Sequence, residues 1–268
     1  MRPPLVKRRN LRQIAVVLLL LLEGCGSESD PLLEETFERL YTVQPNTEIS
    51  IQNHDGAVLV YGANTNELQV RVTKKAYSPM RLKEIAIDVS VQSTTVSIDT
   101  KFPPKPRWAV FDRSGTVDYT IVVPATASIS QLRLVAGEVL VDGMRGPNVN
   151  AWLGDGRMLA HNCFTKIDLV LHRGNLTLSY DWWEHGPFSV HANITQGNAW
   201  AFLPSESAFH LVAEATHGKI SNDFDNLAVE RTAASVAAKI DMLVNGGGQP
   251  PIEIRAAEGD IRIVEANP

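Results

Sequence analysis

The stretch Gly137-Glu138-Val139-Leu140-Val141 follows a pattern that the chain repeats: a glycine, any residue, an apolar residue, any residue, and a last residue that is usually apolar. Seven segments follow this pattern, and they lie at 56–60, 137–141, 156–160, 174–178, 197–201, 218–222 and 259–263. Glycine adopts positive φ without steric cost, so it suits a sharp corner. The two apolar positions are separated by one residue and therefore share one face of a strand. Each segment predicts a corner followed by a short strand with one buried face.

The spacing of these segments predicts how they assemble. From Gly137 to Gly218 the successive glycines are 19, 18, 23 and 21 residues apart, and the step from Gly218 to Gly259 is 41, close to two further periods. A fixed period near twenty residues is typical of stacked repeats, in which each strand pairs with its equivalent one coil above and below. We therefore predict an all-β fold, a single-chain β-solenoid or parallel β-helix-like repeat with about twenty residues per coil. A β-sandwich with glycine in its turns is the alternative.

One repeat domain is predicted over residues 37–268, with residues 26–36 as a tether or cap. Alternating apolar residues continue outside the seven segments, for example at Ile49 and Ile51, and predict half-buried strands. Leu32, Leu33, Phe37 and Leu40 are spaced for one apolar stripe. This stripe predicts that residues 31–46 open with a brief helix or a cap that covers the end of the stack.

Residues 1–25 have the features of an export signal. Five basic residues precede an apolar run from Ile14 to Leu22 that is too short to span a bilayer as a stable helix and fits a secretory signal. The segment Leu22-Glu23-Gly24-Cys25 resembles the bacterial lipobox, in which the cysteine is lipidated and becomes the first mature residue. Glu23 departs from that motif, where a small residue is usual. The resemblance implies a lipoprotein signal peptide with a lipid such as palmitate on Cys25; cleavage without lipidation, or retention as a short anchor, is the alternative.

The charge and the cysteine content of the chain indicate which binding partners and which disulfides are disfavoured. Residues 1–25 hold five basic residues and one acidic residue, so the remainder has 20 basic and 29 acidic residues and a formal charge of −9. An acidic exported domain argues against nucleic acid or an anionic lipid face as the partner. If Cys25 carries lipid, Cys163 has no partner for a disulfide. We expect Cys163 to be a small buried apolar residue rather than a nucleophile.

A family resemblance supports the same architecture. Asn53-His54-Asp55-Gly56 after Ile49-Ser50-Ile51, then Val123-Pro124, then Gly247-Gly248 leading to Glu258-Gly259-Asp260-Ile261, resemble the bacterial putative-adhesin β-strand-repeat family of unknown function. The likeness spans residues 37–265. It implies an all-β, solenoid-like fold on exported or membrane-tethered proteins, and it brings no catalytic residues with it.

Motifs for catalysis, metal or cofactor are not found in the sequence. The seven histidines show neither the HExxH spacing nor a Cys/His cluster, and the chain has no G-x-S-x-G elbow and no phosphate-binding loop. We therefore expect no catalytic residues, no metal site and no cofactor.

The segment Asp181-Trp182-Trp183-Glu184-His185 is the one candidate for binding chemistry. It lies where the glycine spacing widens to 23, so we expect it to bulge outward as a loop. Paired tryptophans could form a flat platform for sugar rings, and Asp181 and Glu184 could bind hydroxyl groups or act as acid and base. Trp200 is expected to face outward as well. The alternative is that these rings cover a gap in the coil or pack on a neighbouring loop.

Two functions agree with these observations. The first is a non-enzymatic envelope lipoprotein, whose solenoid is a scaffold or binding module of the adhesin kind for a cell-surface polysaccharide or an envelope protein. It would be held at the membrane by its lipid, on the periplasmic side of the outer membrane if the organism has one. The second is a β-helix that binds or cleaves polysaccharide. The residue after the glycine varies in sign and chemistry among the segments, which favours binding or structure over catalysis.

Overall fold

The protein is all-β, as predicted. The computed structural model describes residues 31–104, 115–225, 227–229 and 237–266, so the predictions for residues 1–25, including Cys25, lie outside the described residues. The chain divides into residues 1–31 and 32–268, and the fold described below is that of the second unit. No helix among the described residues is long and apolar enough to span a membrane.

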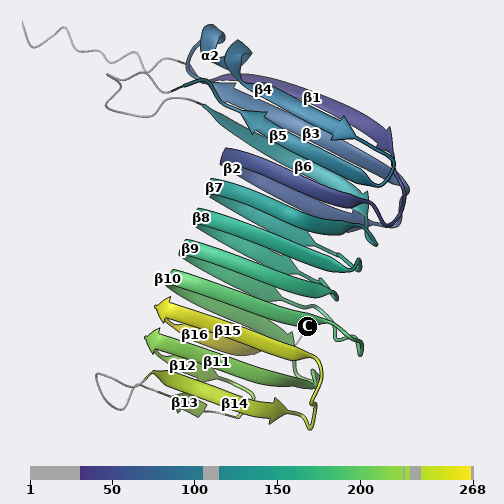
Figure 1. Ribbon diagram of the computed structural model, residues 1–268. Coiled ribbons are helices and arrows are strands. Elements are labelled where there is room, and N and C mark those ends of the chain that lie inside the picture. The colour runs from purple at the N-terminus through teal and green to yellow at the C-terminus, as the bar shows by residue number, and fades with distance from the viewer. Residues whose placement is uncertain (1–30, 105–114, 226, 230–236, 267–268) are drawn as a thin grey trace, which may run out of the picture. The chain divides into compact units, whose positions relative to one another are not determined.

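Sixteen strands form one large mixed sheet, and one short helix accompanies them among the described residues (Figure 1). In chain order they are β1 (Leu33–Thr42), β2 (Glu48–Ala63), β3 (Glu67–Ala76), α2 (Pro79–Glu84), β4 (Ala86–Val91), β5 (Thr95–Lys101), β6 (Thr116–Pro124), β7 (Ser128–Asp142), β8 (Asn148–His161), β9 (Lys166–Ser179), β10 (Ser189–Pro204), β11 (Phe209–His217), β12 (Ile220–Asn222), β13 (Leu227–Val229), β14 (Ala238–Val244), β15 (Pro251–Glu258) and β16 (Ile261–Ala266). The main order across the sheet is β1-β3-β6-β2-β7-β8-β9-β10-β15-β11-β14.

The repeated glycines lie in register across the parallel strands. Gly56 pairs with Gly137, Gly137 with Gly156, Gly156 with Gly174, and Gly174 with Gly197. Gly156 has φ +137°, and a Cβ atom there would lie 1.8 Å from the carbonyl oxygen of Gly137. A side chain at this corner would therefore be both strained and blocked by backbone.

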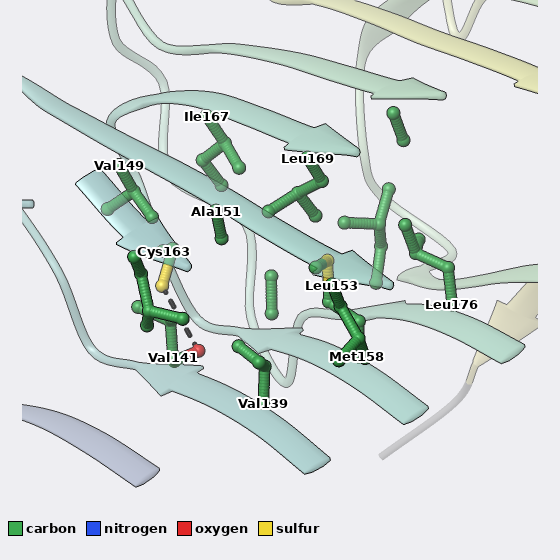
Figure 2. Packing of buried hydrophobic residues seen from close by; sticks show 14 of the residues in the cluster. Val139, Val141, Val149, Ala151, Leu153, Met158, Cys163, Ile167, Leu169 and Leu176 are labelled. Carbon is green, nitrogen blue, oxygen red and sulfur yellow. Dashed lines mark hydrogen bonds between the residues drawn. The ribbon is translucent and has the colours of Figure 1, made fainter. Parts of the chain in front are cut away.

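The apolar positions of the seven segments form two continuous buried rows, as predicted. The first row consists of residues in register on neighbouring strands: Val58, Val139, Met158, Leu176, Ala199, Ile261 and Ile220. The second row is Val60, Val141, Ala160, Leu178, Ala201, Ile263 and Asn222. All are buried, and Figure 2 shows part of this packing. Burying each large aliphatic side chain contributes roughly 1.5–3 kcal/mol before ordering costs.

The order of the last strands differs from the predicted succession. β15 pairs in parallel with both β10 and β11, and β16 pairs in parallel with both β10 and β12. Gly259 therefore lies between Gly197 and Gly218 instead of beyond them. The 41 residues from Gly218 to Gly259 are not two further coils, because β14 runs antiparallel along β11 before β15 inserts.

The N-terminal end also departs from a uniform repeat. β3 pairs antiparallel with β6 and with β1, so this part of the sheet is mixed. The prediction of a brief helix within residues 31–46 is wrong, because β1 is a strand that pairs with β3 over its whole length. Phe37 of the expected stripe packs against the core, whereas Leu40 is 60% exposed. Pairing with β3 outweighs the local helical spacing.

Candidate functional site

The loop at 180–188 joins β9 to β10 across the widest interval between successive glycines from Gly137 to Gly218. Gly174 and Gly197 are 23 residues apart, whereas Gly156 and Gly174 are 18 apart, and the strands keep their register across both intervals. The additional residues therefore lie in the loop and not in the strands. Four of the five predicted binding residues are in this loop: Asp181, Trp182, Trp183 and Glu184.

Trp183 packs toward the core. Its ring centroid lies 5.7 Å from that of Tyr180, 5.3 Å from that of Phe188 and 5.7 Å from that of Phe209. Its Nε1 atom is buried and has no hydrogen-bond partner among the described residues, which has an energetic cost that the ring contacts must offset. Trp183 therefore fills the space beneath the loop, as the alternative interpretation expected for these rings.

Trp182 lies at the surface with 45% of its area exposed. One face of its indole is tilted by 33° against the ring of Phe164 at a centroid distance of 5.9 Å. Its Nε1 atom donates a hydrogen bond of 2.8 Å to Oε1 of Glu184. The Arg145 guanidinium also lies 6.0 Å from the ring centroid, so three contacts hold the ring in place. The two tryptophans do not form the single flat platform that was one of the two interpretations of the sequence.

Arg145, in the turn between β7 and β8, links the loop at 180–188 to the turn that follows β8. Its guanidinium lies 4.5 Å from the centroid of the Phe164 ring. It donates a 2.7 Å hydrogen bond to the carbonyl oxygen of Asn162 and forms a 2.9 Å ion pair with Oε1 of Glu184. The Glu184 carboxylate therefore accepts from both Arg145 and Trp182, and it orients both side chains.

Asp181 is also engaged in holding the loop. Its Oδ2 atom accepts a 3.0 Å hydrogen bond from Asn162 and lies 3.0 Å from Nε2 of His161. These two hydrogen bonds lower the pKa of Asp181 below its ordinary value. The other ring nitrogen of His161 lies 3.0 Å from a carboxylate oxygen of Asp142, so the imidazole links the loop to the end of β7.

A hollow of about 380 Å³ opens beside this loop. Its lining combines apolar rings with charged and polar groups, among them Arg145, Phe164, Lys166, Glu184, His185 and Phe188. Such a lining can pack against the apolar face of a sugar ring and donate hydrogen bonds to its hydroxyl groups. Among the described residues, no group of three or more histidine, cysteine or acidic residues is arranged to hold a metal ion.

Trp200 lies apart from the loop, on β10. It is half-buried, and its register partners on the neighbouring strands are Thr177 and Arg262. Within the described part of the chain, no ring contact joins Trp200 to Trp182 or Trp183. The structure therefore brings four of the predicted residues together and places the fifth in a different hollow, of about 280 Å³.

Arg145 and Phe164 are central to the loop site and were not predicted. They lie in the turns that follow β7 and β8, and the loop at 180–188 follows β9. Arg145 and Phe164 are 19 residues apart, and Phe164 and Trp183 are also 19 apart. The repeat period itself was therefore the signal that could have found them.

Cys163 is a small buried residue, as predicted. Its side chain is 1% exposed, and its thiol donates to the carbonyl oxygen of Val141 at 3.4 Å (Figure 2). Burial raises the pKa of the Cys163 thiol to about 12. A thiol that stays protonated at neutral pH is a poor nucleophile.

One solved structure shares this fold, and two others match it less well. A "putative cell adhesion protein" from Clostridium sporogenes matches with a TM-score of 0.50 and 15% identity, over 87% of this chain and all of that chain. A "putative adhesin" from Bacteroides fragilis has a TM-score of 0.30 and 14% identity, and a "putative lipid binding protein" from Parabacteroides distasonis has 0.35 and 13%; each match covers 86% of this chain and 97% of the other.

The comparison with family models returned no match, and the search of curated proteins returned no significant match. At 15% identity the Clostridium protein shows a shared fold alone. The Clostridium protein is described as a putative cell adhesion protein, which agrees with the putative-adhesin family that the sequence resembles.

Proposed function

We propose that this chain is a non-enzymatic binding module of the bacterial cell envelope that holds a polysaccharide at the loop of residues 180–188. The main support for the proposal is that the Trp182 ring is both exposed and fixed in place. It is exposed at the surface, yet Phe164 supports one face and Glu184 fixes its N–H group. A ring that is fixed before the ligand arrives loses little entropy on binding, which favours a recognition role.

A β-solenoid is the proposed scaffold. From β7 to β10 every pair of consecutive strands is parallel and returns to the same register at its glycine. Consecutive strands joined by hairpins in a sandwich would be antiparallel. The repeated return to one register therefore supports a wound chain over two facing sheets.

The engaged carboxylates favour binding over hydrolysis. Asp181 and Glu184 are the acidic residues of the predicted constellation, and each accepts hydrogen bonds that hold the loop together. A general acid needs a raised pKa so that it can keep its proton near neutral pH. The pKa of Asp181 is lowered instead.

Retention on immobilised polysaccharides, with assay of released sugars, tests this role. We expect Trp182→Ala to weaken retention about tenfold, because it removes the exposed ring. Leu243→Ala is the matched control, since Leu243 is also an exposed apolar side chain (58%) but lies on β14. Unchanged retention in Trp182→Ala would overturn the proposal, and sugar release that stops in Asp181→Asn or Glu184→Gln would establish the polysaccharide-cleaving alternative.

The envelope location rests on the N-terminal segment. We propose that Cys25 carries a lipid that holds the protein at the membrane, on the periplasmic side of an outer membrane where one exists. Membrane fractionation of the Cys25→Ser variant tests this proposal, with Cys163→Ser as the control because it removes the other cysteine. If Cys25→Ser remains in the membrane fraction, the anchor is not at Cys25.

A further inference from the structure

A second hollow, of about 280 Å³, lies on the outer face where β10, β16 and β12 meet. Trp200 is in register with Arg262, and Arg262 is in register with Ser221. Asn198, Lys219 and Asp260 complete the rim, two residues nearer the glycine corner. Because β16 inserts between β10 and β12, these groups come from strands that are distant in sequence.

The polar rim of this hollow is held by side-chain to backbone hydrogen bonds. The backbone N–H of Asp260 donates to Oδ1 of Asn198 at 3.0 Å, and the backbone N–H of Lys219 donates to Oδ1 of Asp260 at 2.9 Å. These bonds orient the Asn198 amide so that its NH₂ group remains able to donate to a ligand. The rim is therefore formed before a ligand binds.

Arg262 differs from the other arginines that the structure describes. Most of them have an acidic partner: Arg71, Arg81, Arg145, Arg157, Arg173 and Arg255. Arg39 and Arg133 lie over aromatic rings. Within the described residues Arg262 is exposed and has neither kind of partner. Its charge is thus available to an external anion.

Another arginine–tryptophan pair in the same sheet forms a cation–π contact that Trp200 and Arg262 do not form. Arg133 and Trp152 are also register partners on neighbouring strands, and the Arg133 guanidinium lies 3.8 Å from the Trp152 ring centroid. The cation there covers the indole face. Trp200 and Arg262 make no such contact, and both line the hollow instead. A half-buried indole and an exposed cation therefore lie side by side in the lining of one hollow.

We infer that this hollow binds an acidic sugar residue, such as a uronic acid within a polysaccharide. The sugar ring would pack on Trp200, and its carboxylate would pair with Arg262. Asn198 and Ser221 can hydrogen-bond hydroxyl groups, while the Asp260 carboxylate, which also lines the hollow, accepts from the backbone N–H of Lys219. The volume is at the lower end of small-molecule sites, which suits one or two rings. The inference extends the proposed polysaccharide binding to a different face and to a ligand of defined charge.

Titration of the purified chain with a galacturonic acid trimer tests the inference, with the methyl ester of that trimer as the uncharged probe. We expect Arg262→Gln to weaken binding of the acid about tenfold and to leave binding of the ester unchanged, because it removes one charge-assisted pair. Trp200→Ala should weaken binding of both probes. Arg157→Gln and Trp152→Ala are matched controls, since Arg157 is paired with Glu138 and Trp152 is covered by Arg133.

Each outcome separates this site from the loop site. Loss of acid binding in Trp182→Ala but not in Trp200→Ala would overturn the inference and leave the proposed function intact. No measurable binding of the acid, or equal losses in Arg157→Gln and Arg262→Gln, would also overturn it. Equal binding of a polyglutamate peptide that is insensitive to Trp200→Ala would show that the hollow attracts anions without recognising sugars. Thermal unfolding of every variant establishes that the fold is retained.

Discussion

The strands from β7 to β10 follow one another in space as they do in sequence, whereas the strands from β11 to β16 do not. In the first region every new strand pairs with the one before it, in parallel and with glycines aligned. In the second region β15 lies between β10 and β11, and β14 runs antiparallel at the edge. A local repeat is sufficient to specify the first region, but the second depends on pairing between residues far apart in sequence.

Deleting residues 251–266 should have the largest effect on this comparison. The deletion removes β15 and β16, so β10 loses its partner on one side and β11 loses its link to the parallel ladder. We expect loss of cooperative unfolding in urea and aggregation through the exposed edges. Deleting Leu33–Thr42 is the control, because β1 is an edge strand whose loss leaves the ladder paired. Equal behaviour of the two deletions would contradict the distinction between the regions.

Gly156→Ala tests the corner of the regular region. The methyl group would meet the Gly137 carbonyl oxygen, and the backbone would keep a positive φ that alanine resists. We expect the free energy of unfolding to fall by roughly 3–5 kcal/mol, measured by urea denaturation. Gly186→Ala is the control, since none of the described residues lies within 4 Å of a Cβ atom there. A loss below about 1 kcal/mol for Gly156→Ala would show that the corner can relax.

Leu171→Ala and Leu243→Ala compare the buried ladder with the edge. Leu171 on β9 is fully buried, so its truncation should cost about 2–5 kcal/mol through lost burial and a cavity. Leu243 on β14 is 58% exposed, and its truncation should change stability by about 0.5 kcal/mol or less. Chemical denaturation measures both changes. A large loss for Leu243→Ala would indicate that another part of the protein covers β14.

Ionisation of Cys163 is expected to affect stability only at alkaline pH, with no effect near neutral pH. The folded thiol has a pKa of about 12 against an ordinary value of 9.0, so above pH 9 the unfolded chain loses a proton that the folded chain keeps. The free energy of unfolding should therefore fall as pH rises from about 9 toward 12. Cys163→Ala should show a shallower fall between pH 8 and pH 11 than the unmodified chain. Parallel pH profiles would mean that the thiol ionises without unfolding.

Much of the fold could be predicted from the seven glycine segments. Val58, Met158 and Ile220 occupy equivalent positions in their segments, and the structure places them in one buried row. The insertion of β15 could not be predicted, because no local pattern records which strands meet across the sixty or so residues between Ala192 and Ile254. The β1 strand was missed because pairing with β3, and not its own apolar spacing, decides its conformation.

The candidate site was predicted in position but not in detail. The widened glycine spacing correctly located the loop that carries Trp182 and Trp183. Adjacent residues in a loop have no periodicity, so the sequence could not tell that one ring packs inward and the other faces out. The neighbours of Trp200 depend on the insertion of β16 beside β10. The pairing of Trp200 with Arg262 could not be predicted, because no local pattern shows that these two strands meet.

The inserted strand also has a consequence for how the protein is made. His210 on β11 pairs with Pro251 on β15, which the ribosome adds about forty residues later. The strands from β7 to β10 can pair while synthesis continues, because each pairs with the strand made just before it. β11 cannot pair with β15 until β15 has been translated. Until then, the edges of β10 and β11 that β15 will cover can be bound by chaperones or by other nascent chains. The rate of translation through residues 211–258 should therefore affect the yield of folded protein.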